Sequence, residues 1–334
     1  MLRLVVRRLL QLIPTLLGLS VLLFLWLNRL PGGPASAILG ERATEADVAR
    51  INRILGLDQP VWVQYGRFLK RIFELDLGTS VQTGQPVWDE FALRFPATVE
   101  LSVAAMIIAV VVGIPLGYLA AKRRGGWLDV ASVSGSLVGI CIPVFFLALI
   151  LKGVFAVNLG LLPSYGRLST GLDATSVTGL AVLDGLLTGE FDASWDAFRH
   201  LILPAVTLAS IPLAVIVRMT RASVLEVLGE DYIRTADSKG LQKNTIRVRH
   251  VLRNALLPVV TAIGLLTGSL LSGAVLTESV FSFNGIGDFI RTSIDARDYP
   301  VLVGFIMFIA VVYVLINLLV DLAYSLIDPR VRVH

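Results

Sequence analysis

The stretch VELSVAAMIIAVVVGIPLGYLA, residues 99–120, contains a single charged residue, Glu100. A helix that crosses the roughly 30 Å hydrocarbon core of a membrane needs about 20 mostly apolar residues, and this stretch satisfies that requirement. Five further stretches have the same character: residues 9–27, 130–157, 201–217, 256–276 and 301–319. The sequence therefore predicts an all-α membrane protein with six transmembrane helices.

The composition agrees with a lipid environment. Of the 334 residues, 55% are hydrophobic and 16% are charged, whereas about 25% are charged in an ordinary soluble domain. The net charge of +4 comes from basic residues beside the apolar stretches, which is typical of membrane orientation and argues against nucleic acid as a partner. The chain has one cysteine, Cys141, so it cannot form an internal disulfide or a cysteine-based metal site.

The first apolar stretch could be mistaken for a signal peptide. Arg3, Arg7 and Arg8 precede it, and the sequence ASA at residues 35–37 resembles a cleavage site. However, its apolar run is longer than the 7–15 residues typical of a signal peptide. We therefore expect a retained membrane anchor.

Basic residues predict the orientation of the spans. With the N-terminus inside, the inner loops hold most of the basic residues, and the two short outer loops hold only Arg167, Arg199, Arg291 and Arg297. The third outer loop, residues 28–98, is long enough to be exempt from this rule. We expect a multi-pass membrane protein with both termini on the inner, cytoplasmic side.

The loop after the first span is expected to form a small external helical domain, residues 30–98. Thr44 and Asp47 resemble a capping box, and Gly56 followed by Pro60 is a helix stop signal. A second amphipathic run covers residues 62–73. Two interpretations remain open: a cover over the span ends, or a docking surface for something delivered from outside.

A charged stretch, EDYIRTADSKGLQKNTIRVRHVLRNALLP, lies between the fourth and fifth apolar stretches at residues 230–258. Apolar residues at helical spacing predict one helix that ends at Lys239 and Gly240, with this stripe: Leu225, Leu228, Tyr232 and Ala236. A second helix is expected to begin near Asn244 or Thr245, and Pro258 marks the start of the fifth span. Such a hairpin could lie on anionic headgroups or protrude towards a partner protein. The turn glycine and the Arg253–Asn254 pair favour the partner.

The segments EDYIRTADSKGL and RHVLRNALLP resemble the cytoplasmic coupling loop in the membrane subunits of bacterial ATP-binding-cassette (ABC) importers, in the dipeptide and oligopeptide permease version. The general family has a Glu-Ala-Ala triplet where this chain has Arg234-Thr235-Ala236. His250 and Arg253 depart from the general pattern as well, but all these departures are similar to the peptide-permease variant. Further segments that resemble the same subunit type are RRLLQLIPTLLG, LGLDQP, DLGTSVQTGQPV, PATVEL, GIPLG, LPAVTLA and TESVFSFNGIGDF. The resemblance covers nearly the whole chain.

The resemblance implies a permease subunit that moves dipeptides or oligopeptides, with nickel chelates, haem or another small solute as the alternative. It implies three parts: residues 1–29 with the first span, the external domain 30–98, and a five-helix core 99–334 with the coupling loop 219–256. The implied partners are a second, homologous permease subunit, two ATPase subunits, an external solute-binding protein, membrane lipid and the peptide substrate. The chain contains no G-x-x-x-x-G-K-[ST] loop. We expect a non-catalytic subunit without a cofactor or metal, whose ATPase partners bind ATP and Mg.

Two sets of site residues follow from the resemblance. The coupling set is Glu230, Asp231, Tyr232, Arg234, Thr235, Ala236, Asp237, Lys239, Gly240, Arg249, His250, Arg253 and Asn254. The candidate outer gate is Phe281, Phe283, Asn284, Gly285, Gly287 and Asp288. Lys152, Glu278 and Asp321 lie towards span ends, where charged side chains can reach water. Pro115 is expected to break or kink the second span.

Other classes of membrane protein fit less well. A secondary transporter would need ionisable residues near the membrane midplane and usually inverted repeats, and neither is visible. An intramembrane enzyme would need a nucleophile and base or metal ligands within the spans, whereas His200, His250 and His334 fall in loops, at a span edge or at the terminus. A receptor without transport remains open, and co-purification with an ATPase separates it from an importer.

Overall fold

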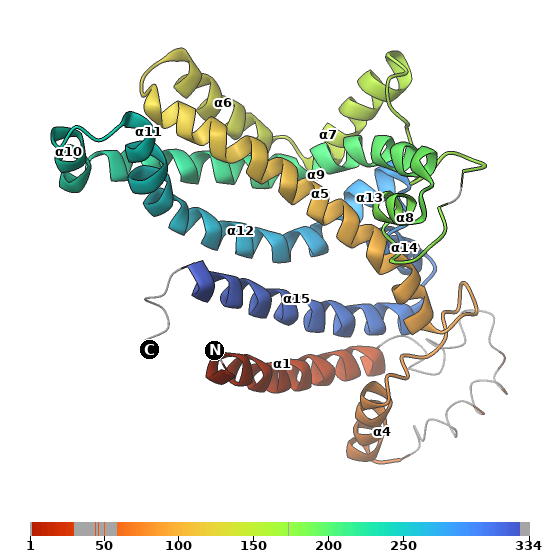
Figure 1. Cartoon of the computed structure of the whole chain (residues 1–334). Helices are drawn as coiled ribbons and strands as arrows, with labels where there is room; N and C mark the ends of the chain where they lie inside the picture. The colour runs from red at the N-terminus through yellow and green to blue at the C-terminus, as the bar shows by residue number, and fades with distance from the viewer. Residues whose placement is uncertain are drawn as a thin grey trace. The chain divides into compact units, whose positions relative to one another are not determined.

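The computed structural model describes residues 2–29, 44, 46, 50, 59–172 and 174–327. Within these residues it is helical, with one isolated β-bridge between Thr79 and Pro86 and no strand. Five helices there are long and apolar enough to cross a membrane: Leu10–Arg29, Val87–Lys122, Phe191–Leu228, Lys243–Leu270 and Tyr299–Leu319. A bent helix pair brings the number to as many as six. The all-α membrane fold is confirmed (Figure 1).

The third predicted span, residues 130–157, is not one straight helix. It consists of α6 (Trp127–Cys141), α7 (Val144–Leu151) and a π-helical continuation (Lys152–Asn158), with a bend of 104° between α6 and the rest. The break falls at Ile142 and Pro143. Proline lacks a backbone N–H and disfavours a helical conformation in the residue before it, and Ile142 is accordingly extended, with φ −76° and ψ 121°. The segment is a broken span or a re-entrant loop.

Four other helices continue through prolines, among them α1 (Leu2–Arg29) at Pro14. Helix α5 (Val87–Lys122) passes Pro115 without a break, so the second span is not broken there, and the alternative expectation of a kink stays a prediction. Helix α9 (Phe191–Leu228) contains Pro204 and Pro212, and its 38 residues far exceed the predicted span 201–217. Helix α12 (Arg253–Gly273) contains Pro258, which therefore lies inside the helix rather than at its start.

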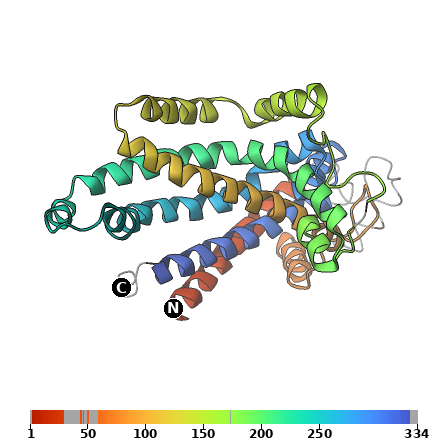
Figure 2. The same ribbon diagram turned by 45° about the horizontal axis from the view of Figure 1, so that its top comes forward.

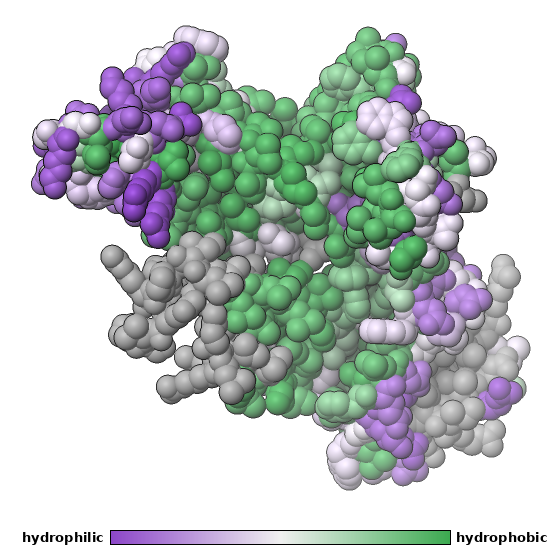
Figure 3. Space-filling view, viewed as in Figure 1, coloured by the Kyte–Doolittle hydropathy of each residue, from purple (hydrophilic) through white to green (hydrophobic). Residues whose placement is uncertain are grey.

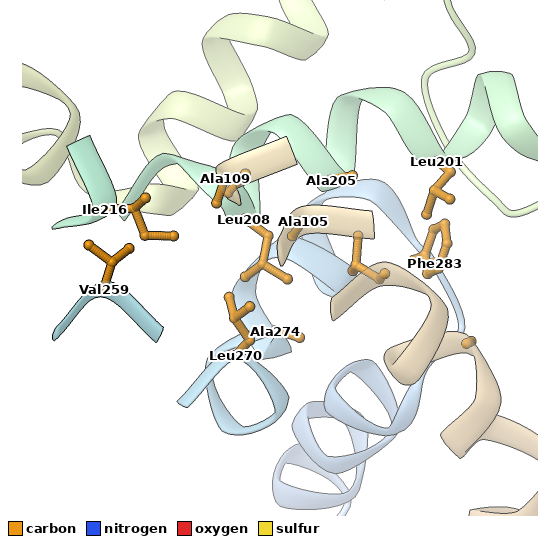
Figure 4. Packing of buried hydrophobic residues seen from close by; sticks show 13 residues of the cluster. Ala105, Ala109, Leu201, Ala205, Leu208, Ile216, Val259, Leu270, Ala274 and Phe283 are labelled. Atoms are coloured by element: carbon orange, nitrogen blue, oxygen red, sulfur yellow. The ribbon is translucent and has the colours of Figure 1, made fainter. Parts of the chain in front are cut away.

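The chain divides into two compact units, each described by itself. Unit 1 comprises residues 1–96 and 284–318, and unit 2 comprises residues 97–283 and 319–334. The core of unit 2 joins α5, α9 and α12 (Figure 4). Helix α5 contributes small residues to this core: Ala105 and Ala109 are fully buried against Leu208 and other residues of α9. Small residues let membrane helices approach closely without any hydrophobic drive from water.

Two glycines of the GIPLG motif bring α5 and α9 together. A Cβ atom on Gly113 would lie 2.8 Å from Cγ2 of Ile216, and one on Gly117 would lie 2.6 Å from the carbonyl oxygen of Val217. No side chain fits in the second position unless the helices separate. The motif therefore provides a close contact between α5 and α9, which the sequence did not predict.

Unit 1 contains α1 (Leu2–Arg29), α4 (Val61–Phe73), α14 (Ile286–Asp295) and α15 (Tyr299–Ile327), the last as far as residue 318. One apolar cluster includes Phe91, Ile286 and Phe289, and a second joins Leu23 to Met307. The buried carboxylate of Asp298 accepts hydrogen bonds from the Ser80 hydroxyl (2.6 Å) and the Gln82 backbone N–H (3.1 Å). These bonds fix the loop that leads into α5.

The external domain predicted for residues 30–98 is described only in part. Helix α4 confirms the second amphipathic run, with one side packed on α1. The helix expected between Thr44 and Pro60 lies largely outside the described residues. A further short helix, α8 (Ala181–Thr188), belongs to unit 2 and was not predicted from the sequence. Figure 2 shows α6 and α7 as separate helices on either side of their break.

Candidate functional site

The charged hairpin begins with a helix break. Helix α9 ends at Leu228, Gly229 follows as its cap, and Glu230 is extended, with φ −72° and ψ 142°. The next helix, α10, covers Asp231–Ser238. The predicted single helix carrying Leu225, Leu228, Tyr232 and Ala236 was therefore wrong. Glycine has a low helix propensity, and Asp231 in the first turn of α10 suits the positive end of a new helix.

The apolar side of α10 faces inward. Ile233 and Ala236 are buried in a cluster with Val224 of α9, and with Ile246 and Val251 of the following segment. This cluster secures the hairpin to its own unit. The apolar residues of α10 therefore hold the hairpin in place and leave mostly polar groups for contact with a partner.

The end of α10 has the geometry that the sequence predicts. The Gly240 N–H donates to the Asp237 carbonyl at 2.9 Å, and the Leu241 N–H donates to the Ala236 carbonyl at 3.3 Å. Together these bonds form a Schellman motif, with Gly240 in the left-handed region at φ +70°. A glycine is suited to this position because it has no Cβ to strain.

The second arm begins with α11 (Lys243–Thr245), near the predicted start, and widens into a π-helix over Ile246–Leu252 before α12. The Asn254 side chain donates hydrogen bonds to the Tyr232 hydroxyl (3.0 Å) and the His250 carbonyl (2.9 Å), which links the two arms. The Arg247 guanidinium lies 5.6 Å from the centre of the Tyr118 ring. Two points of contact therefore orient the second arm.

Most of the predicted coupling residues share one exposed surface. Ala236 is buried and His250 is half-buried. The exposed members are Glu230, Asp231, Tyr232, Arg234, Thr235, Asp237, Lys239, Gly240, Arg249, Arg253 and Asn254. Hydrophilic residues gather over α10 and α11, beside the apolar surface of the adjoining helices (Figure 3). This surface presents charges of both signs, which suits recognition of a charged protein surface. Its role in coupling stays a prediction.

A charged pair that the sequence analysis missed lies next to the hairpin. Arg221 of α9 binds Asp129 of α6 through two guanidinium nitrogens, and its Nη2 is 2.9 Å from Oδ2. The same carboxylate accepts the Gly125 backbone N–H at 2.9 Å. The two residues are 92 positions apart in the chain, so no local sequence pattern indicates that they pair. It ties the loop before α6 to the helix that leads into the hairpin.

The predicted outer gate begins at the end of α13 (Val275–Phe281) in unit 2. Phe281 is buried against Ala148 and Leu203, and Phe283 is buried in the core shared by α5, α9 and α12. The Arg167 guanidinium lies 5.7 Å from the centre of the Phe283 ring. Ser282 between them has φ +49°, so the chain turns sharply there. The two phenylalanines are anchors for this turn.

The remaining gate residues belong to unit 1. Asn284 is exposed and has φ +54°, Gly285 is the N-cap of α14, and Gly287 is buried in its first turn. Oδ1 of Asp288 lies 3.6 Å from Nε of Arg291, which follows one helical turn later. These residues form a sharp turn followed by an amphipathic helix. Their action as a gate stays a prediction.

One span-end charge, Glu278, does not reach water as expected, whereas Lys152 is half-buried. Glu278 is fully buried and accepts a hydrogen bond of 2.6 Å from the Thr98 hydroxyl. Lys152 donates to the Val280 carbonyl at 2.9 Å. Both bind groups of unit 2, because a buried charge is costly unless it is paired. The side chain of Asp321 lies outside the described residues.

Polar contacts also order the segment before α9. Glu100 of α5 accepts hydrogen bonds from Arg167 at 2.6 Å and from the Val182 N–H at 2.9 Å. Hydrogen bonds from the Thr175 backbone N–H, the Thr175 hydroxyl and the Thr188 hydroxyl lower the pKa of Glu190 below its ordinary value of 4.5. Glu190 therefore stays charged at neutral pH and holds the ends of residues 175–188 together.

The fold and the hairpin define a polytopic α-helical membrane protein whose charged hairpin joins two spans. The family described as "Binding-protein-dependent transport system inner membrane component" matches residues 113–333, and the N-terminal component of the same system matches residues 1–102. The chain belongs to this family. It is therefore an inner-membrane component of a binding-protein-dependent transport system.

Curated relatives match over nearly the full length. The chain is 46% identical over 332 residues to the dipeptide transport system permease protein DppB of Alkalihalophilus pseudofirmus, covering 99% of this chain and 100% of the relative. It is 46% identical to the DppB protein of Escherichia coli strain K12, covering 99% of both chains. It is 39% identical to the glutathione transport system permease protein GsiC of Salmonella paratyphi A, again covering 99% of both.

A solved structure is similar in fold. A chain from the inward-facing MetNI methionine ABC transporter matches with a TM-score of 0.50 and 17% identity, covering 70% of this chain and 93% of that chain. At this identity the likeness concerns the fold alone. It agrees with the all-α permease architecture expected from the sequence.

Proposed function

We propose that this chain is the permease subunit of an ATP-driven importer that moves dipeptides or oligopeptides across the bacterial inner membrane. The observation that carries the proposal is the 46% identity to DppB proteins over 99% of this chain. The matched length includes the spans, the hairpin and the outer turn. It favours a peptide substrate over the nickel chelate, haem or other small solute kept as alternatives.

The hairpin supplies the coupling step of this proposal. A separate ATPase subunit receives the exposed surface of α10, and its ATP-driven closure shifts the spans between inward-facing and outward-facing states. Such a shift requires that the ATPase bind the hairpin with different free energy in the two states. The rigid attachment of α10 through Ile233 and Ala236 supports force transmission to α9.

The proposed assembly contains a second, homologous permease subunit, two ATPase subunits and an external solute-binding protein. The permease chain is non-catalytic in this scheme, and the ATPase subunits bind ATP and Mg. Among the described residues, no three His, Cys, Asp or Glu side chains cluster as metal ligands.

A reconstituted complex tests the substrate. Proteoliposomes that contain the permease pair and its ATPases, with the cognate binding protein added outside, should accumulate a labelled dipeptide only when ATP is supplied inside. A matched complex with an inactive ATPase subunit should give background uptake. Uptake of a nickel chelate or haem in preference to every peptide tested would overturn the proposed substrate, and uptake with the inactive ATPase would overturn the mechanism.

Single cysteines test the proposed orientation. In a Cys141→Ala background, Thr44→Cys should react with an impermeant maleimide from the outside and Ser238→Cys only from the cytoplasmic side, because an odd number of crossings separates them. Both positions are exposed. Inverted and right-side-out vesicles provide the comparison. Labelling of both cysteines from one side would rule out the six-span arrangement.

A further inference from the structure

One side of helix α4 packs on α1. The Tyr65 hydroxyl lies 3.0 Å from the Ser20 hydroxyl, and the Tyr65 and Phe68 rings pack on Phe24 with centroid distances of 5.4 and 5.7 Å. Ile72 continues the same contact. Figure 1 shows α4 beside the Arg29 end of α1 and steeply inclined to it.

The contacts place α4 at the depth of the membrane boundary. The apolar span of α1 is Leu10–Arg29, and at 1.5 Å per residue Ser20 lies about 13 Å before its end. Trp26 packs on Tyr299 with a centroid distance of 5.8 Å, and such aromatic pairs are typical of the membrane–water interface. Ser20 lies about 9 Å deeper along α1 than Trp26. A helix that contacts Ser20 and Phe24 therefore lies beside the last turns of the span.

The sides of α4 that do not contact α1 expose large apolar residues together with cations. Trp62 is 76% exposed and Phe73 is 79% exposed. Arg67 and Lys70 are exposed between them, and no residue of α4 is fully buried. A basic amphipathic helix with exposed aromatic residues is the kind that lies in the interface of a membrane. In water the same side chains would expose apolar surface at a free-energy cost.

We propose that α4 is an interfacial helix that lies in the outer surface of the bilayer. Trp62 and Phe73 lie at the boundary between headgroups and acyl chains, and Arg67 and Lys70 lie at the level of the lipid phosphates. The partner of this face is lipid, which decides against its use as the docking surface for a binding protein. The inference rests on α1 as a membrane span and on the proposed orientation, but not on the substrate or the ATPase.

Spin labels measure the environment directly. In the Cys141→Ala background, nitroxides are attached at Trp62→Cys, Phe73→Cys and Lys70→Cys in the full-length protein, reconstituted in phosphatidylethanolamine–phosphatidylglycerol vesicles without a binding protein. Leu22→Cys, on the exposed face of α1, is the lipid reference, and Ser238→Cys, on the hairpin, is the water reference. All five positions are exposed, so the substitutions leave packing intact.

The ratio of collision rates with oxygen and with a water-soluble nickel chelate reports depth. Labels at residues 62 and 73 should give a ratio several-fold above the water reference and close to the lipid reference, and a label at residue 70 should give an intermediate ratio. A ratio at residues 62 and 73 equal to the water reference would overturn the proposal. Low collision rates with both reagents would mean that protein covers the face, which also overturns it. Neither result depends on whether the protein transports peptides.

Discussion

Alanine at position 117 is expected to destabilise the protein although alanine favours helix formation. Relative to glycine, alanine stabilises a helix interior by about 1 kcal/mol. Here its Cβ would lie 2.6 Å from the Val217 carbonyl oxygen and 2.7 Å from Cβ of Thr220, and neither atom can rotate away. Helices α5 and α9 must separate, and overpacking of this kind costs about 1–3 kcal/mol. Gly117→Val should lose most of the folded protein.

Gly135 provides the matched control, because it also lies inside a helix and a Cβ there would meet nothing within 4 Å. Thermal midpoints in detergent, followed by fluorescence-detected size exclusion, should fall for Gly117→Ala and stay unchanged or rise for Gly135→Ala. Equal midpoints for the two alanine variants, with normal accumulation of Gly117→Val, would show that α5 and α9 do not make this close contact.

Composition and length were sufficient to find the apolar spans, but they did not reveal how proline acts in each one. Pro143 interrupts the third span, whereas Pro204 and Pro258 lie inside unbroken helices. In a membrane helix the groups that a proline leaves without partners can be satisfied by neighbouring helices or by local π-helical turns. Whether a proline breaks a span therefore depends on tertiary contacts that the local sequence does not encode.

In the hairpin too, some features follow from the local sequence and others depend on contacts with residues elsewhere in the chain. The turn at Gly240 follows from local chemistry, because a glycine just after a helix is a common helix end. The inward side of α10 could not be predicted, since it depends on Ile246 and Val251 in the other arm. The error over the apolar stripe has a local cause: helical spacing was extended across Gly229, where the chain leaves the helix.

Pairs of polar residues that lie far apart in the chain could not be predicted from the sequence. Thr98 and Glu278 are 180 positions apart, and Asp129 and Arg221 are 92 positions apart. Each pair satisfies a charge that an apolar environment would otherwise penalise. A charged residue in an apolar stretch therefore indicates that a partner exists, but its identity requires the fold.

Gly240→Val is expected to abolish most ATP-driven uptake while the protein still inserts and pairs with its partner permease. Gly240 has φ +70°, a conformation that costs a residue with a Cβ about 1–2 kcal/mol. A Cβ there would meet nothing within 4 Å, so the substitution strains the turn without disturbing the packing of the unit. A free-energy change of this size alters a two-state population by a factor of about 5–30. The amount of ATPase that co-purifies and the rate of ATP-driven uptake should each decrease by a factor of about 5–30.

Gly240→Asn is the matched control, because asparagine adopts the left-handed conformation more readily than other residues with a Cβ. Gly240→Asn should retain most of the uptake, and Arg234→Glu should impair the same step by reversing an exposed charge. Gln242→Ala should have little effect. If the hairpin only lies on anionic headgroups, Arg234→Glu will change the dependence on anionic lipid, and Gly240→Val will bind its ATPase and transport normally. That result would exclude the coupling role, because the strained turn would then have no effect on the step that ATP drives.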